Sequence, residues 1–256
     1  MAIAKADYIE GLAKGLAVLE AFDTERQRLN ATLAAQRTGI TRAAARRHLL
    51  TLADLGYLDT DGSHYWLSAR VLRLAGSYMA TSRLPRTLQP TLNRLAAQTQ
   101  AAFSAVVRDG DECVIVARSA GVAEPVRHLA YGLHLGARLP AHATSTGRVL
   151  LASLPKAEFA AWLKGRELAR ITPQTEVNVT RFKALIEQVR QADHCLARDG
   201  HELGIHALAV PLRNMQGQTL AALNVVGTAE QLSDAAVQRQ WLPLLLEAAR
   251  ELRPLL

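Results

Sequence analysis

Cysteines and aromatic residues are scarce in this sequence. The two cysteines, Cys113 and Cys195, lie far apart and outside any CxxC spacing, which argues against a disulfide scaffold and against a thiolate zinc site. We interpret both as buried hydrophobic residues. Aromatic residues make up 5% of the chain, so Leu, Ala and Val must fill most of the core. Ordinary packing of such a core needs no cofactor, and we predict none and no metal.

Signals for secretion or membrane insertion are also missing. The N-terminal residues lack the uninterrupted apolar segment of a signal peptide, and no later stretch reaches the roughly 18 apolar residues of a transmembrane helix. We therefore expect a cytoplasmic protein that does not bind membranes. A chain of 256 residues with 49% hydrophobic content can form one large domain or two modest ones.

Acidic residues are absent from one part of the chain. The net charge is +7, and residues 26–53 contain six arginines and one histidine but no Asp or Glu. This stretch should carry a positive potential that attracts phosphate groups. A run of charge alone is also typical of a solvated surface. With the pattern described next, double-stranded DNA becomes the leading partner.

The N-terminal pattern predicts three helices. Apolar residues at helical spacing predict the first over residues 9–23. Asn30 is a suitable N-cap for a second helix that Gly39 would end, and Thr41 is a suitable N-cap for a third that runs to about Asp54. Two helices joined by a tight turn that contains glycine are the outline of a helix-turn-helix.

A predicted hairpin follows these helices directly. Residues 57–60 and 65–67 read as two short strands around an Asp-Gly turn, and a hairpin in this position is typical of a wing. Pro85 and Pro90 indicate a boundary before a helix at 91–99. Further hairpins are expected at 102–108 with 113–118 and at 206–212 with 219–227, and further helices at 72–81, 144–153, 156–163, 179–199 and 234–252. The sequence therefore predicts an α+β fold with an antiparallel sheet in its larger part.

The third helix carries the predicted DNA contacts. On a helical projection Ala45 and Leu49 face inward, whereas Arg47 faces outward. Small residues beside the arginines would let the helix approach a major groove, where arginine can bond phosphates or guanine. The predicted contacts are Arg37, Thr41, Arg42, Ala43, Arg46, Arg47 and Thr51, together with Ser63 and His64 on the wing.

Four segments resemble one family of regulators. They are LAKGLAVLEAF, TLAAQRTGITRAAARRHLLTLADLGYL, LPAHATSTGRVLLASL and HALAVPLRNMQGQTLAALNVVG. Together they resemble transcriptional regulators of the IclR family over nearly the whole chain. The run ARRHLLTLADLGYL is similar to the subgroup that controls aromatic-acid catabolism.

The resemblance implies a particular organisation. It implies a winged helix-turn-helix in residues 1–70, a linker helix in 71–85, and a GAF-like effector-binding and oligomerisation domain in 86–256. It also implies a homodimer or homotetramer that controls a promoter operator in response to a small acid. The predicted effector is an aromatic acid such as 4-hydroxybenzoate or protocatechuate.

The predicted effector site lies in a cationic part of the larger domain. Residues 114–150 contain seven Arg and His residues and one acidic residue, Glu124, and a buried carboxylate needs such charge-assisted donors. The segment Ser145-Thr146-Gly147 can open a helix whose N–H groups attract anions. The resemblance adds Asn224 and, more loosely, residues 202–207. The predicted contacts are Arg127, Leu129, His134, Leu139, His142, Ser145, Thr146, His206 and Asn224.

Enzymatic alternatives find little support. The segment His201-Glu202-Leu203-Gly204-Ile205-His206 is similar to a zinc-protease helix, but its histidines are five residues apart instead of four, so they would not share a zinc ion on one helix face. No GxSxG, P-loop or GxGxxG motif is present. The remaining alternative is a GAF-like small-molecule-binding or hydrolytic protein without sequence-specific DNA binding.

Overall fold

The chain forms two compact units. The structure, a computed structural model, describes residues 4–23, 26–119 and 134–256, and the units are Met1–Thr81 and Ser82–Leu256. The division falls inside the predicted linker of residues 71–85, and the three domain limits given above remain predictions. None of the helices within the described ranges combines the length and the apolar character needed to cross a membrane.

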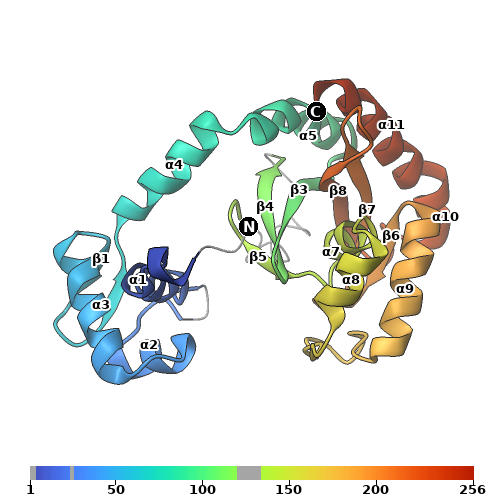
Figure 1. The fold of residues 1–256 in the computed structure, drawn as a ribbon. Coiled ribbons are helices and arrows are strands. Elements are labelled where there is room, and N and C mark those ends of the chain that lie inside the picture. The colour runs from blue at the N-terminus through green and yellow to red at the C-terminus, as the bar shows by residue number, and fades with distance from the viewer. Residues whose placement is uncertain (1–3, 24–25, 120–133) are drawn as a thin grey trace. The chain divides into compact units, whose positions relative to one another are not determined.

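The N-terminal unit is a helix-turn-helix with a small wing (Figure 1). A 3-10 turn, Lys5–Asp7, precedes helices α1 (Glu10–Glu20), α2 (Ala31–Thr38) and α3 (Arg42–Asp54), the hairpin β1 (Leu58–Thr60) with β2 (Tyr65–Leu67), a 3-10 turn Ala69–Val71, and helix α4 (Leu72–Thr81). The winged helix-turn-helix expected from the sequence is confirmed.

Short-range capping fixes the ends of α2 and α3. The Asn30 side chain accepts hydrogen bonds from the amides of Thr32 and Leu33, both at 3.0 Å. Gly39 ends α2 with a φ of 68°, a left-handed conformation that glycine adopts without strain. Thr41 then caps α3 by accepting from the amide of Ala44 at 3.2 Å. These caps set the tight turn between the two helices.

The core of this unit ties the wing to the helices. Val18 of α1 and Leu49 of α3 are fully buried in one cluster with Leu29 and Tyr65. Leu29 also pairs with Tyr65 through two backbone hydrogen bonds, at 2.8 and 3.0 Å. An antiparallel bridge therefore joins the wing strand β2 to the segment before α2, and the hairpin packs as part of the unit.

The C-terminal unit is built on a six-stranded antiparallel sheet with the strand order β5-β4-β3-β8-β7-β6. Its strands are β3 (Ala102–Asp109), β4 (Glu112–Arg118), β5 (Arg138–Pro140), β6 (Cys195–Arg198), β7 (Ile205–Arg213) and β8 (Thr219–Thr228). Its helices are α5 (Arg83–Thr99), α7 (Ser145–Ala152), α8 (Lys156–Leu163), α9 (Val179–Ala192), α10 (Asp234–Ala236), a π-helical turn (Val237–Trp241) and α11 (Leu242–Leu252), with a 3-10 turn at Arg253–Leu255. The predicted α+β class is confirmed.

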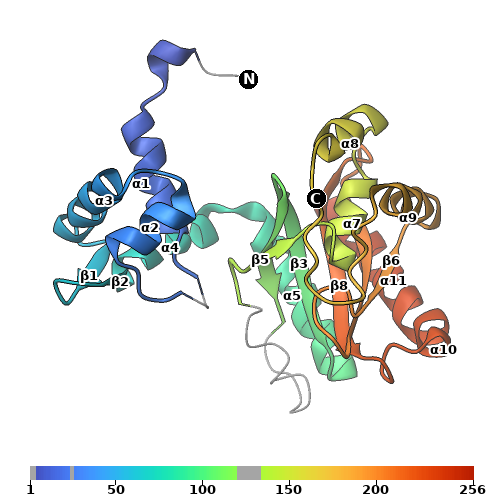
Figure 2. The same ribbon diagram turned by 90° about the horizontal axis from the view of Figure 1, so that it is seen from below.

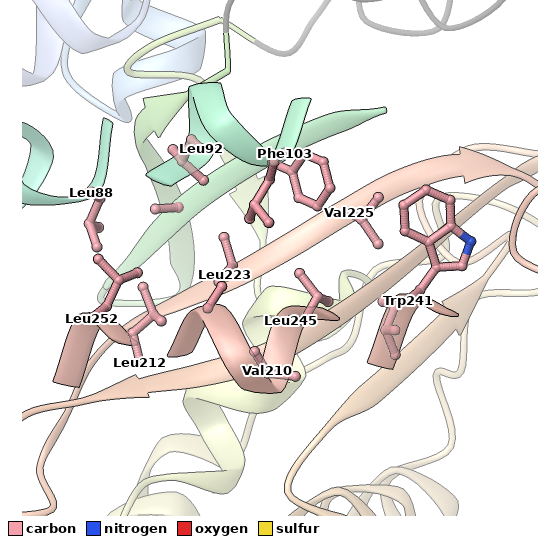
Figure 3. Packing of buried hydrophobic residues seen from close by; sticks show 14 of the residues in the cluster. Leu88, Leu92, Phe103, Val210, Leu212, Leu223, Val225, Trp241, Leu245 and Leu252 are labelled. Carbon is pink, nitrogen blue, oxygen red and sulfur yellow. The ribbon is translucent and has the colours of Figure 1, made fainter. Parts of the chain in front are cut away.

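Helices cover both faces of this sheet (Figure 2). On one face, Leu88 and Leu92 of α5 and Leu245 of α11 pack against Phe103 of β3 and Leu223 of β8 (Figure 3). On the other face, α7, α8 and α9 pack over the alternate side chains of the same strands. Side chains alternate between the two faces along each strand, so position along a strand decides which core a residue joins.

Both cysteines lie in the core under α7 and α9. Neither forms a disulfide, and burial raises the pKa of Cys113 to about 12 and also raises the pKa of Cys195. A thiol held protonated in this way is unreactive. The interpretation of both cysteines as buried hydrophobic residues is confirmed.

The predicted start of the helix before the sheet is wrong. Instead of beginning at residue 91, α5 begins at Arg83 and continues through Pro85 and Pro90. Pro85 lies in the first turn, where a backbone N–H has no acceptor within the helix. Pro90 removes a hydrogen bond in the middle of the helix, but burial of Leu88 and Leu92 on either side of it stabilises the helix.

The predicted end of the helix at residues 179–199 is also wrong. The helix expected to reach residue 199 ends at Ala192, and residues 195–198 form the edge strand β6. Asp193, with a φ of 58°, takes the left-handed position that ends the helix, a role that non-glycine residues other than Asn seldom fill. A short apolar run does not by itself distinguish strand from helix, and pairing with β7 decides for the strand here.

Candidate functional site

The outward face of α3 presents the predicted DNA contacts. Ala43, Arg46, Arg47 and Thr51 are exposed, as are Thr41 and Arg42 at the start of the helix. Ala45, Leu49 and Leu52 are buried on the opposite side. With alanine instead of longer residues beside the arginines, a groove can approach the helix backbone closely.

Three of these side chains have partners within the protein. Thr41 caps α3, and the Thr51 hydroxyl donates to the carbonyl oxygen of Arg47 at 2.9 Å. Arg37, exposed on α2, forms an ion pair with Asp23. An exposed ion pair is weak, so a DNA phosphate can compete for Arg37, whereas Arg46 and Arg47 have no ion pair within the described residues to give up.

The wing turn is closed by a single carboxylate. Asp61 accepts hydrogen bonds from the amide of His64 at 2.7 Å and from the amide and hydroxyl of Ser63, both at 2.9 Å. Bonds from the backbone amides of His64 and Ser63, and then from the Ser63 hydroxyl, lower the pKa of Asp61 to about 2. Ser63 is exposed at the tip and His64 is half-buried. Both positions are therefore shaped by the turn before any DNA is present.

Arg28 is a further basic residue beside the wing that sequence reasoning did not single out. Its guanidinium lies over the Trp66 ring, 4.1 Å from the centroid, and one of its nitrogens is 3.6 Å from a carboxylate oxygen of Asp61. Its place in the acid-free stretch was a signal, but its contact with the second wing strand depends on the fold of the hairpin.

A cavity of about 550 Å³, counted with its space open to solvent, lies between the start of α7 and strands β6, β7 and β8. It is lined by Leu139, Ala143, Thr144, Ser145, Thr146, Ala197, Gly200, His201, Glu202, Ile205, Ala207, Asn224 and Val226. Its size lies in the range of small-molecule sites, and a mainly apolar lining with a few convergent polar groups is typical of them.

The polar groups of the cavity converge at the first turn of α7. The Thr144 side chain accepts from the amide of Gly147 at 3.2 Å, while the amides of Ser145 and Thr146 have no acceptor within the helix. Ser145 Oγ and Asn224 Oδ1 are buried and have no hydrogen-bond partner among the described residues. Buried polar atoms are normally paired, so this end of the cavity suits a polar ligand group.

Two glycines allow the walls of the cavity to approach each other. A Cβ on Gly147 would lie 2.6 Å from the carbonyl carbon of Ala141, and a Cβ on Gly200 would lie 2.6 Å from the carbonyl oxygen of Ala143. Side chains cannot occupy such positions, so α7, the turn before it and the loop after β6 pack at backbone distance.

Residues 169–175 form a segment, called the strap below, that makes hydrogen bonds to both walls of the cavity. Thr172 donates to the carbonyl oxygen of Asp199 at 2.6 Å, and Thr175 donates to that of Gly200 at 2.8 Å. On the other wall, His142 Nε2 donates to the carbonyl oxygen of Ala169 at 2.9 Å. Burial lowers the pKa of His142 more than the bond to the Ala169 carbonyl raises it, which favours the neutral ring with its proton on Nε2.

The predicted effector residues other than His206 fall into three groups. Leu139, Ser145, Thr146 and Asn224 line the cavity. His134 is exposed and bonds to the carbonyl of Leu135, while His142 lies in the wall behind the lining. Arg127 and Leu129 lie outside the described residues.

His206 belongs to the opposite face of the sheet. Its neighbours on β7, Ile205 and Ala207, line the cavity, whereas Leu208, two residues on, belongs to the core under α5 and α11. Alternation along the strand places His206 with Leu208. Its Nε2 lies 3.7 Å from a carboxylate oxygen of Asp199. His206 and the cavity residue His201 therefore do not converge on one metal ion.

Other cavity residues were missed by sequence reasoning. Ala197 and Gly200 lie on and after β6, the strand that was predicted as helix, so nothing in the pattern placed them near α7. Val226 had a usable signal, because it lies two positions beyond Asn224 on the same strand and must share its face.

An exposed arginine-bearing helix, a wing and a separate domain with a polar-ended cavity define a winged helix-turn-helix transcriptional regulator. The family profile described as IclR helix-turn-helix domain matches residues 11–62, and the one described as bacterial transcriptional regulator IclR C-terminal matches residues 76–253. The chain belongs to the IclR family, which consists of transcriptional regulators and not of enzymes.

Two relatives from Acinetobacter baylyi match nearly the whole chain. The p-hydroxybenzoate hydroxylase transcriptional activator is 51% identical over 97% of this chain and 92% of its own length. The Pca operon regulatory protein is 46% identical over 98% of this chain and 90% of its own length. Among solved structures, the inducer-binding domain of a PobR double mutant from Acinetobacter, in complex with 3-hydroxybenzoic acid, is 44% identical with a TM-score of 0.61; the match covers 67% of this chain and 98% of that domain.

Proposed function

We propose that this regulator binds a promoter operator through α3 and the wing, and that a small aromatic acid in the cavity beside α7 controls that binding. The observation that carries the proposal is the cavity itself. It joins an apolar lining to a polar end where two buried oxygen atoms, Ser145 Oγ and Asn224 Oδ1, have no partner among the described residues.

The printed functions of the relatives support an aromatic acid as effector. One relative activates transcription for p-hydroxybenzoate hydroxylase, and the domain from Acinetobacter was solved with 3-hydroxybenzoic acid. In this chain the first-turn amides of α7 suit a carboxylate, because helix N-termini attract anions. Leu139, Ala207 and Val226 offer apolar surface to a ring.

Calorimetry with 4-hydroxybenzoate and 4-hydroxybenzamide tests the effector class. The amide keeps the ring and the hydroxyl but lacks the negative charge. An unpaired buried polar group costs about 1 to 3 kcal/mol, so we expect the acid to bind at least about fivefold more tightly. Equal affinities, or binding of neutral compounds alone, would contradict a carboxylate effector. Protocatechuate and its amide give a second matched pair.

Operator binding is tested by Arg47→Ala. Arg47 is exposed on α3 without an ion pair among the described residues, and one arginine contact to a base is worth about 1 to 3 kcal/mol. We expect at least about fivefold weaker binding to a promoter fragment in a gel-shift titration. Arg73→Ala, an exposed arginine on α4, removes the same charge and should leave affinity nearly unchanged.

Preference for one DNA sequence at moderate salt separates this function from the remaining alternative. A protein that only attracts phosphate loses affinity steeply with salt and does not prefer one sequence over another. We expect a clear preference for the promoter fragment over a shuffled sequence at moderate salt. Binding without that preference would favour a small-molecule-binding protein whose basic helix does not read DNA.

We also propose that the regulator acts as a symmetric dimer or tetramer in the cytoplasm, where promoter DNA is found. Leu12 and Leu16 of α1 and Leu72 of α4 are exposed, and such apolar surface is typical of a contact between subunits. A helix-turn-helix commonly reads two half-sites. Light scattering that finds monomer alone, with and without operator DNA, would contradict this assembly.

A further inference from the structure

A row of polar residues crosses three strands on the cavity face of the sheet. Arg118 of β4 pairs with Ser104 of β3, and Ser104 pairs with Asn224 of β8. Directly opposed residues of antiparallel strands share a face. Because Asn224 lines the cavity, Ser104 and Arg118 lie on the same face. The adjacent pair Ala105 and Ala117 belongs to the core on the other face, as alternation requires.

The spacing of this row brings Arg118 within reach of the cavity. Neighbouring strands lie about 4.8 Å apart, so roughly 10 Å separates the backbones at Arg118 and Asn224. The intervening residue, Ser104, has a short side chain, which leaves room for an arginine chain to extend across it. Gln89 fixes the end of β4 by donating to the Arg118 carbonyl oxygen at 2.7 Å.

Among the arginines near the cavity, Arg118 differs from Arg138 and Arg148 in lacking a partner within the described residues. Arg138 pairs with a glutamate, and Arg148 donates from Nε to the carbonyl of His142. His134 and His142 each bond to a backbone carbonyl. Within the described ranges, the Arg118 guanidinium has no carboxylate or hydrogen-bond partner, although it is half-buried and burial lowers its pKa.

We propose that Arg118 supplies the positive charge that pairs with the carboxylate of the aromatic acid, opposite the first-turn amides of α7. The guanidinium presents paired N–H groups that match the two oxygens of a carboxylate. The carboxylate would lie over Ser104, with Asn224 beside it and the ring toward the apolar lining. The inference rests on the proposed function and names the charged residue of its site.

Calorimetry on the full-length chain tests Arg118 with two ligands. Arg118→Met removes the charge and keeps most of the length of the side chain. We expect 4-hydroxybenzoate to bind this variant at least about tenfold more weakly, which corresponds to about 1.4 kcal/mol, and 4-hydroxybenzamide to change by less than about threefold. Arg108→Met is the matched control, because Arg108 is exposed on the neighbouring strand, and it should bind both ligands as the wild type does.

The outcomes separate this inference from the proposed function. If the wild type binds neither 4-hydroxybenzoate nor protocatechuate, the proposed effector class is wrong. If the wild type binds the acid and Arg118→Met binds it equally well, the assignment of Arg118 is overturned and the effector class stands.

Thermal unfolding without ligand tests whether Arg118 has a structural role instead. Removing a desolvated charge that has no partner should leave the melting temperature unchanged or raise it. A lower melting temperature together with a parallel loss of acid and amide binding would show a structural role and overturn the proposal. Arg118→Lys, which keeps the charge without the paired N–H groups, should recover part of the affinity for the acid alone.

Discussion

The two units of this regulator build their candidate functional surfaces in different ways. The predicted DNA contacts all come from residues 37–64, and local bonds from Asn30, Thr41 and Asp61 fix their backbone. The cavity instead collects side chains from residues 139–226, and backbone contacts between distant segments hold it together. The first surface depends on capping and turn chemistry, whereas the second depends on tertiary packing. The two should therefore respond differently to substitution.

The largest effect is expected at Gly147. Alanine there would place a Cβ against the backbone of Ala141, which cannot move without moving the cavity wall, so we expect a loss of roughly 3 kcal/mol in unfolding free energy. Gly76 on α4 is the matched control, because nothing lies within 4 Å of its Cβ position. Gly76→Ala should be neutral or stabilise the helix by about 0.5 to 1 kcal/mol. Urea unfolding of both variants measures the difference, and equal stability would contradict the close packing of α7.

The next effect is expected in the strap. Thr175 Oγ1 accepts from the amides of Ile171 and Thr172 at 3.2 and 2.8 Å and donates to the carbonyl oxygen of Gly200. Thr175→Val leaves these buried groups without a partner, and we expect a loss of about 2 kcal/mol. Thr180→Val on the exposed side of α9 should change stability by less than about 0.5 kcal/mol. Calorimetric unfolding compares the two, and similar melting temperatures would show that the strap does not stabilise the loop.

A smaller effect is expected from the cap of α2. Asn30→Ala removes the acceptor for the amides of Thr32 and Leu33, which should cost about 1 kcal/mol. The loss should be confined to the N-terminal unit and is best followed by hydrogen exchange of peptides from each unit. Gln36→Ala, exposed on the same helix, serves as control. Faster exchange spread over both units would contradict the local nature of the cap.

The smallest effects are expected from pH, and they should separate the two units. Burial lowers the pKa of His142 and of His201, so the unfolded chain binds protons more readily than the folded one. The stability of the C-terminal unit should therefore fall as the pH drops below about 6.5. His142→Gln should remove part of this loss.

The wing should respond only at lower pH. The pKa of Asp61 is lowered to about 2, so its contribution is present above about pH 4 and is lost as the pH falls toward 2. Asp61→Asn should abolish this dependence and leave the loss near pH 6 unchanged. Exchange measurements at stepped pH would contradict this separation if both units lost protection over the same range.

The same contrast explains what the sequence could predict. The bounds of α3 follow from Thr41 and the apolar spacing behind it, because a cap and an amphipathic face are properties of neighbouring residues. Ser145 and Thr146 were predicted for the same reason, as the start of a helix, and they line the cavity. Asn224, which also lines the cavity, was predicted only through family resemblance, because its burial beside α7 depends on sheet pairing.

Residues of the cavity that depend on distant pairing were not predicted. The strand β6 is defined by its hydrogen bonds to β7, and with that segment taken as helix, Ala197 and Gly200 had no reason to lie near residue 143. His206 was grouped with the cavity although its strand turns it to the other face. The alternation was visible in the sequence, but the face that bears the cavity was not.

The strap of residues 169–175 also affects how fast a ligand can leave. Because Thr172 and Thr175 bond to the carbonyls of Asp199 and Gly200, the loop beside the cavity cannot swing aside by rotating a single side chain. A ligand that exits past this loop must wait for those buried bonds to break. Under the proposed function, the residence time of the acid, and with it the duration of the transcriptional response, would depend in part on two threonines that do not line the cavity.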